Sequence, residues 1–161
     1  MHVFSCRLIC NLLLYGVSNY LLRKVQSVQN AAACRTTGTR RCKHITPVLQ
    51  KWNWLPVRRR VEFTLACLVR QSLAGQTPSY LAFDIQLTVD TSRPQLRSAS
   101  ERICVVPRRD NNFGDRSFSA AGPQVWNALP SHLRWDMNYR HFKHALKGHM
   151  FKLWSTTAHC D

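Results

Sequence analysis

Carboxylates are scarce in this chain, and none occurs in its N-terminal part. The 161 residues include 8 Asp and Glu against 23 Lys and Arg, and no acid precedes Glu62, whereas eleven basic residues do. No two Asp are adjacent, so the chain lacks the paired carboxylates that hold two divalent cations during phosphoryl transfer. Asp110 and Asp115 flank an Asn-rich turn and are expected to cap it. We therefore predict no catalytic residues and no enzymatic activity.

The chain also lacks a cysteine pattern with a defined chemistry. Its seven cysteines are an odd number without short repeated spacing, which favours free thiols in a reducing compartment over a disulfide framework. We therefore expect an intracellular protein, in the nucleus or cytoplasm. Cys34, Cys42 and His44 do not have the spacing of a zinc site, and His141 with His144 has no nearby Glu to complete a metallohydrolase pattern. We expect no metal, no cofactor and no small-molecule substrate.

No apolar run is long and clean enough for a membrane span. The most apolar stretch, residues 1–22, is interrupted by Asn11 and Tyr15 and shows no small-residue cleavage site. A secretory signal is the alternative to a buried helix here, and we favour an apolar helix over residues 1–17. A single segment then covers residues 18–154, and residues 155–161 form a frayed tail.

Hydrophobic spacing together with start and stop residues predicts a mainly α fold with a small β element, an α+β arrangement. Helices are expected over residues 8–15, 19–33, 46–51, between Pro56 and Gly75, 123–129 and 139–154. The one strand candidate is Ile103–Val106, which Pro107 ends. It is expected to pair with residues 113–121 as one short hairpin.

The helical periods also predict which side chains face the core. In the second helix the inward stripe is Leu21, Val25, Val28 and Ala32, and in the fourth it is Val57, Val61, Leu65, Leu68 and Ser72. In the last helix Tyr139, Phe142, Leu146, Met150 and Leu153 face inward, and Arg140, Lys143, Lys147 and Lys152 face outward. Cys67 is expected to be a small buried hydrophobe.

The most unusual feature is the formal charge of +15, with a pI near 10.4. Such a balance is typical of a domain that binds a phosphate backbone, although a solvated face or an acidic membrane surface is also consistent with it. Three arginines, Arg58 to Arg60, open a helix where its dipole disfavours cations, which suggests an external anion despite the nearby Glu62.

Basic residues alternate with aromatic ones in the part of the chain that lacks acids. The candidate contacts to RNA or DNA are Arg40, Arg41, Lys43, Lys51, Trp52, Arg58, Arg59 and Arg60, with Arg108, Arg109 and Arg116 as a second cluster. Such a pattern fits phosphate contacts and base stacking that do not read the sequence. We favour a core position for Trp54 and Trp126 and leave Trp52 open between stacking and packing.

Residues 113–134 read FGDRSFSAAGPQVWNALPSHLR, an aromatic pair around a Gly-Asp turn followed by a Trp-bearing helix that Leu129-Pro130 closes. This block resembles the segment after the polymerase core in reverse transcriptases of non-LTR retrotransposons, the jockey-type and related long interspersed elements. Further similar blocks follow the family order: LLYGVSNYLLRKVQSVQNAA (13–32), HITPVLQKWNWLPVRRRVEFTLACLV (44–69), TPSYLA (77–82), LRSAS (96–100) and VVPR (105–108). The resemblance extends from Cys6 to Trp154. Residues 33–38, ACRTTG, depart from it by losing two apolar residues, as an old genomic copy would.

The resemblance implies a truncated copy of the helical segment that follows the thumb of an RNA-directed DNA polymerase. The parent's aromatic-x-Asp-Asp turn is absent, so the implied role is non-catalytic, sequence-tolerant RNA or DNA binding beside a reverse-transcriptase core. One alternative is a structural or interaction module that docks on the missing thumb. The other is a relic with no independent function.

Overall fold

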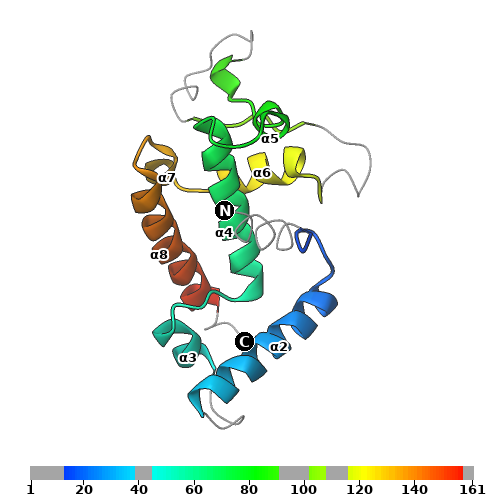
Figure 1. Cartoon of the computed structure of the whole chain (residues 1–161), viewed down its shortest axis with the longest axis vertical. Helices are drawn as coiled ribbons and strands as arrows, with labels where there is room; N and C mark the ends of the chain where they lie inside the picture. Colours follow the sequence, from blue (N-terminus) through cyan, green and yellow to red (C-terminus); the bar gives the residue numbers. More distant parts are fainter. Residues whose placement is uncertain (1–12, 39–44, 91–101, 108–115, 158–161) are drawn as a thin grey trace.

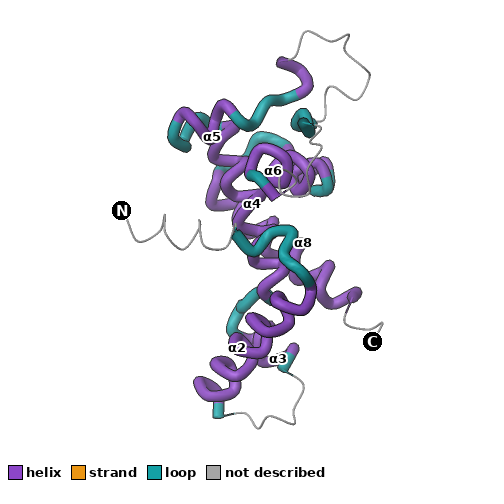
Figure 2. The backbone as a smooth tube through the Cα atoms, turned by 90° about the vertical axis from the view of Figure 1, so that its right-hand side faces the viewer, coloured by secondary structure: helices purple, strands orange, loops and turns teal. Residues whose placement is uncertain are grey.

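The chain is mostly helical, as its sequence predicts. The computed structural model describes residues 13–38, 45–90, 102–107 and 116–157. Its elements are α2 (Asn19–Thr37), α3 (Thr46–Lys51), α4 (Val57–Leu73), α5 (Ser79–Phe83), the 3-10 turn η1 (Thr88–Asp90), α6 (Phe118–Asn127), α7 (Ser131–Arg134) and α8 (Tyr139–Thr157). Two views at right angles place α2 and α3 at one end of the molecule and α5 and α6 at the other (Figures 1 and 2).

Helix α4 is the centre of the fold, and α2, α5, α6 and α8 all contact it (Figure 1). Its predicted inward stripe is buried, from Val57 to Ser72. The opposite side is buried as well, because α6 and α8 cover it; Ala66 and Val69 are fully enclosed. The sequence period indicates one apolar face, whereas the structure makes the C-terminal half of α4 an interior helix.

The inward face of α2 differs from the predicted one. Leu21 and Val28 are 49% and 69% exposed, whereas Ala33 is buried. Two glutamines face α4 instead: Gln26 Oε1 accepts the Val57 N–H at 2.8 Å, and Gln29 Nε2 donates to the Leu55 carbonyl at 3.0 Å. The first N–H groups of α4 have no partner within their own helix, so Gln26 caps α4, and both bonds help to hold α2 in place.

Helix α6 begins at Phe118, five residues before the predicted start at Pro123. The prediction used proline as a first-turn residue, but here Pro123 lies within the helix and is itself buried. Ala120, Ala121 and Gly122 allow close packing against α4, because alanine has only a methyl side chain and glycine has none. A Cβ built on Gly122 would lie 3.0 Å from Val69 Cγ2.

The predicted hairpin is absent from the described residues, and only a single antiparallel bridge, Leu87 to Cys104, remains of the β element. Val105 N donates to Gln86 O at 2.8 Å and Thr88 N to Ile103 O at 2.9 Å. The pairing predicted for residues 113–121 is wrong for Phe118 onward, because those residues form the first turn of α6; residues 113–115 lie outside the described ranges.

The other edge of this bridge is occupied by a side chain. The Asn127 amide donates to Cys104 O and accepts from Cys104 N, both at 2.9 Å. One asparagine thus satisfies the backbone groups that a partner strand would otherwise pair with. This is the physical reason why the extended segment needs no hairpin.

The two ends of the chain also depart from the prediction. Residues 13–16 form a turn rather than the end of an apolar helix, and residues 1–12 lie outside the described ranges. Helix α8 continues past the predicted end at Trp154 to Thr157. None of the helices in the described part combines the length and apolarity needed to cross a bilayer.

Candidate functional site

Several predicted contact residues lie outside the described parts of the chain. These are Arg40, Arg41, Lys43, Arg108 and Arg109. The remaining candidates, Lys51, Trp52, Arg58 to Arg60 and Arg116, belong to different elements.

Lys51 and Trp52 end α3, and both are exposed. Asn53 follows in the left-handed conformation, with φ 54°, which asparagine tolerates better than most residues. Trp54 is 37% exposed and meets Trp52 (52% exposed) edge to face, with ring centroids 6.4 Å apart. The core position predicted for Trp54 is wrong, because Leu55 is buried there instead and Trp54 contacts Trp52.

The indentation beside this tryptophan pair is lined by α2 and α3 as well, but it has no room for even one water molecule. The pair therefore offers ring edges and faces at the surface rather than a pocket. Surface rings can stack on a nucleobase without selecting it.

The three arginines at the start of α4 do not form one cationic patch. Arg59 Nη1 donates to Glu62 Oε2 at 2.8 Å, and Arg58 Nε lies 3.8 Å from Glu62 Oε1. Arg60 turns inward: burial lowers the pKa of its guanidinium, and its Nε has no hydrogen-bond partner in the described structure. Arg58, which also pairs with Glu62, has a side chain 70% exposed and lies mainly in solvent. Glu62 therefore supplies, within the molecule, the negative charge that offsets two of the arginines at the start of α4.

Arg116 is exposed and lies next to Gly16. Gly16 has φ +67°, and a Cβ built there would come within 2.8 Å of Arg116 Cγ. The arginine stem therefore packs on the turn that precedes α2. Its two predicted partners in the second cluster fall outside the described ranges, so this cluster is not assembled here.

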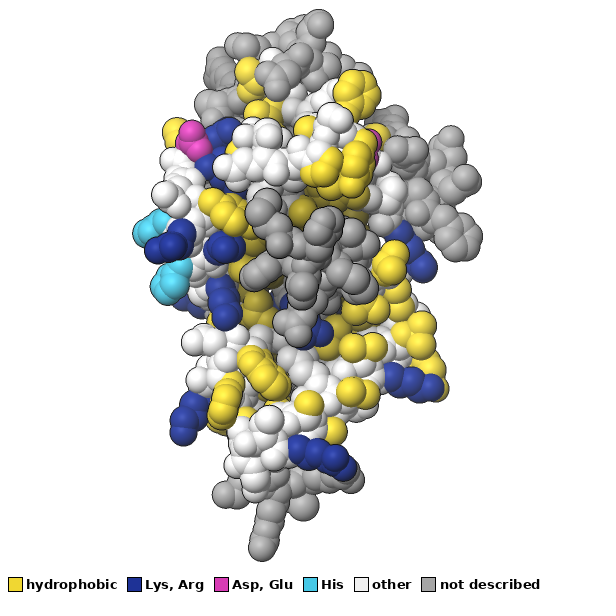
Figure 3. Space-filling model, viewed as in Figure 1, with side chains coloured by type: hydrophobic (Ala, Val, Ile, Leu, Met, Phe, Trp, Pro, Cys, Tyr) yellow, Lys and Arg dark blue, Asp and Glu magenta, His cyan; other side chains and the backbone are white. Residues whose placement is uncertain are grey.

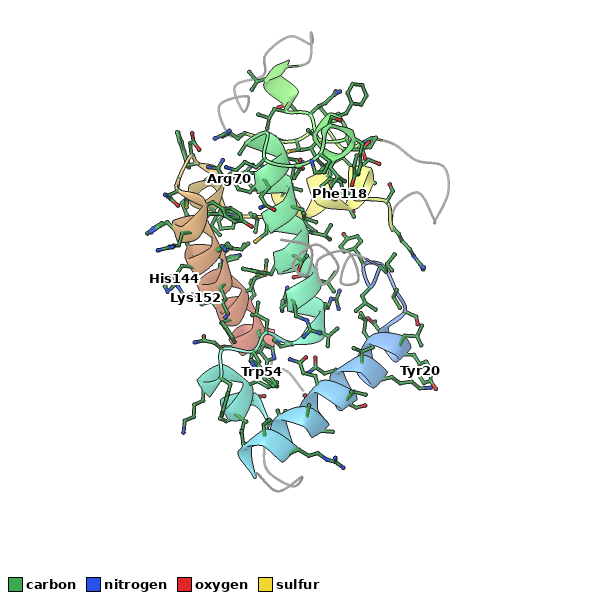
Figure 4. The ribbon with its side chains drawn as sticks, in the orientation of Figure 1. Tyr20, Trp54, Arg70, Phe118, His144 and Lys152 are labelled. Atoms are coloured by element: carbon green, nitrogen blue, oxygen red, sulfur yellow. The ribbon has the colours of Figure 1, made fainter. Side chains whose placement is uncertain are left out.

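A basic surface on α8 was not nominated from the sequence. Its 19 residues contain no Asp or Glu, and Arg140, Lys143, His144 and Lys147 recur at helical spacing. Phe142, Leu146 and Met150 are buried on the opposite side. Figure 3 shows Lys, Arg and His side chains along the edge that α8 forms, and His144 points away from α4 in Figure 4. The usable signal in the sequence was the absence of acids over residues 139–157.

His149 joins this surface to the arginines of α4. Burial lowers the pKa of its imidazole, and electrostatic interactions with His132, Arg59 and Lys152 lower it further. These neighbours come from α7, α4 and α8. Arg59 of α4 thus acts on a residue of α8.

The described cysteines are free thiols, as predicted: Cys34, Cys67 and Cys104 form no disulfide. Burial raises the pKa of both Cys67 and Cys104 to about 12, so neither is a nucleophile at neutral pH. Within the described ranges, no group of three or more His, Cys, Asp or Glu is placed to hold a metal ion.

No protein-family model matches this chain, and no curated protein or solved structure matches it either.

Proposed function

We propose that this chain is a non-catalytic nucleic-acid-binding segment that contacts RNA or DNA phosphates without reading the sequence. We further propose that it descends from the segment after the polymerase core of a non-LTR retrotransposon reverse transcriptase. The ordered sequence blocks that end in residues 113–134 support the origin. Nucleic acid is then the partner, inside the cell, with a reverse-transcriptase core as a second possible neighbour.

The observation that carries the binding proposal is the unbalanced surface charge. Glu62 and Asp136 carry the ion pairs of the described structure, and each already holds two arginines of the chain. The exposed cations of α3, α4 and α8 therefore lack enough internal anions to neutralise them. A surface of this kind attracts a polyanion by releasing its counterions.

Fluorescence anisotropy of the full chain with labelled oligonucleotides tests the proposal. We expect several unrelated sequences to bind alike, and the logarithm of the binding constant to fall linearly with the logarithm of salt concentration. A strong preference for one sequence, or binding that does not weaken as salt rises, would remove the electrostatic argument.

The proposed origin has a separate test in the DNA upstream of Met1. We expect the reading frame there, even if interrupted by stops, to encode an aromatic-x-Asp-Asp polymerase motif. An unrelated upstream sequence would contradict a truncated copy and leave the binding proposal standing.

A second candidate function is a module that docks on another part of a polymerase. Exposed apolar side chains on α2, namely Tyr20, Leu21 and Val28, favour it; Tyr20 points away from the rest of the molecule (Figure 4). Thermal unfolding of the isolated chain by circular dichroism separates the two readings. A cooperative transition would argue against dependence on a missing partner, whereas a non-cooperative one would support docking.

A further inference from the structure

The outer face of α8 combines positive charge with regular spacing, and Arg140 and Lys143 are exposed whereas Lys147 is half-buried. Arg140, Lys143 and Lys147 lie on neighbouring turns, with His141 and His144 between them. Arg140 and Lys147 are two turns apart, about 10 Å at 1.5 Å per residue. That length matches about three phosphates of one strand, which are spaced about 3.4 Å along the axis.

The N-terminal end of α8 adds to this positive surface. Asn138 caps the helix, since its Oδ1 accepts the Arg140 N–H at 2.9 Å. The positive end of the helix dipole coincides with Arg140 and Lys143 in the first turns, and these two cations repel each other and the dipole. A broad, open depression next to it is lined by Asn138, Arg140, His141 and His144. All four side chains can donate hydrogen bonds, and none is a carboxylate.

The nearest carboxylate in the sequence does not neutralise this face. Asp136 accepts from Arg70 at 2.5 Å and lies 3.7 Å from Arg102. Its charge is thus already matched by two arginines outside α8. The cations of α8 have no acid of their own helix to pair with.

The burial of α8 decides between two kinds of anionic partner. A basic amphipathic helix binds a lipid surface by inserting its apolar face. Here Phe142 and Leu146 are fully buried and Met150 nearly so, because they pack in the protein core. The helix therefore presents only its polar half, which suits a phosphate backbone rather than a bilayer.

We propose that the outer face of α8 is the main phosphate-tracking surface of this chain. Arg140, Lys143 and Lys147 supply the charge contacts, and His141 and His144 supply hydrogen-bond donors in the depression. The ligand is the sugar-phosphate backbone of an RNA or DNA strand. This inference rests on the proposed nucleic-acid binding and assigns it to α8 instead of the stretch before Glu62.

Two triple variants of the full chain test the assignment. The first is Arg140→Gln, Lys143→Gln and Lys147→Gln on α8. The matched control is Arg23→Gln, Lys24→Gln and Arg35→Gln on α2. Both sets remove three positive charges from one helix, and each contains one lysine over a tyrosine ring, Lys143 on Tyr139 and Lys24 on Tyr20.

The readout is anisotropy with a single-stranded RNA and a duplex DNA between about 50 and 200 mM salt, with thermal melts to confirm that both variants fold. We expect the α8 variant to bind roughly 100-fold more weakly near 0.1 M salt. The slope of log binding constant against log salt concentration should be smaller in magnitude than that of the wild type by about two to three. Each lost phosphate contact removes about 0.7 to 0.9 from this slope. The α2 control should keep the wild-type slope.

The possible outcomes separate the proposed function from the assignment to α8. Wild-type protein that binds neither oligonucleotide would overturn the proposed function and this inference with it. Wild-type binding that both variants weaken equally would keep the function and overturn the α8 assignment, because net charge alone would then explain affinity. If the α8 variant alone loses affinity, and loses more of it for the RNA than for the duplex DNA or the reverse, the assignment would be supported and the preferred nucleic acid identified.

Discussion

Arg70 of α4 and Asp136 of the α7–α8 connection form an ion pair with very unequal exposure. The Arg70 side chain is 8% exposed and that of Asp136 81%. Arg70 Nη2 donates to Asp136 Oδ1 at 2.5 Å and to the Met137 carbonyl at 2.7 Å. One buried guanidinium thereby fixes the segment from which α8 begins, and it connects the central helix to the proposed binding face.

Replacing Asp136 with Asn should destabilise the chain at neutral pH and have little effect in acid. The hydrogen bond from Arg70, with the charges of Arg70 and Arg102, lowers the pKa of Asp136. A lowered pKa contributes stability above the ordinary value, about 3.9, and this contribution is lost as pH falls through the folded-state value. Melting curves at several pH values check this.

Asp84→Asn is the control for that variant, because Asp84 is exposed and has no ion pair in the described structure. We expect the melting temperatures of the wild type and Asp136→Asn to converge as pH falls below about 4, while Asp84→Asn stays close to the wild type at every pH. Equal melting temperatures for all three proteins at pH 7 would show that the ion pair contributes nothing.

Two glycine-to-alanine changes in helices should have opposite effects. Gly122 in α6 faces Val69 Cγ2 at 3.0 Å and Ile85 Cδ1 at 3.3 Å from a built Cβ, whereas nothing lies within 4 Å at Gly148 in α8. Gly148→Ala should stabilise by about 0.5–1 kcal/mol, the usual helix gain. Overpacking costs about 1–3 kcal/mol and should outweigh that gain in Gly122→Ala. Urea unfolding measures both, and a stabilised Gly122→Ala would refute the close packing of α6 on α4.

Trp126 should be the most sensitive tryptophan in the chain. It is fully buried, lies 6.0 Å from the Phe142 ring, and donates its indole N–H to Arg102 O at 2.9 Å. Trp126→Ala should therefore cost about 3–5 kcal/mol of unfolding free energy. Trp135, 63% exposed, provides the control: Trp135→Ala should change stability by no more than about 0.5 kcal/mol.

Buried thiols should resist alkylation while Cys34 reacts. Cys67 and Cys104 are buried, with pKa values raised to about 12, and Cys34 is half-buried. The experiment is alkylation with iodoacetamide at mildly alkaline pH, followed by peptide mapping. Of these three cysteines, Cys34 should be labelled first, and Cys67 and Cys104 only after denaturant is added. Equal labelling rates in the folded protein would contradict the core packing.

The raised pKa values of Cys67 and Cys104 predict that the folded chain becomes less stable at alkaline pH. In the unfolded chain they ionise near their ordinary value of 9.0, whereas in the folded chain they hold their protons to about 12. The unfolded state therefore binds fewer protons above pH 9, and the free energy of unfolding falls as pH rises. Cys67→Ser would leave a polar hydroxyl in the core, so Cys67→Ala is the better variant for reducing this slope.

Helix positions follow closely from the sequence. Thr46–Lys51 is recovered residue for residue, and Pro56 with Gly75 delimits α4, because these signals act within one or two turns of chain. The burial of Phe142, Leu146 and Met150 follows from their period, and that of Trp126 matches its expected role as a packing anchor. Such local rules need no knowledge of which helix packs on which.

Two of the errors concern contacts between residues that are distant in the sequence. Gln26 bonds to Val57 and Asn127 bonds to Cys104. These bonds turn the α2 stripe outward and replace the expected hairpin. Trp54 is exposed, and the adjacent Leu55 is buried. No pattern within a helical period shows that a glutamine will cap another helix.

The sequence by itself determined that the chain is helical, strongly basic and short of carboxylates, because these are properties of composition and local spacing. Only the tertiary structure decided which cations can meet a polyanion. Glu62 engages Arg58 and Arg59, Arg60 is half-buried, and Asp136 is held by Arg70 and Arg102, whereas α8 contains no acid. Charge is a sum over residues, whereas its availability depends on the distances that folding sets between them.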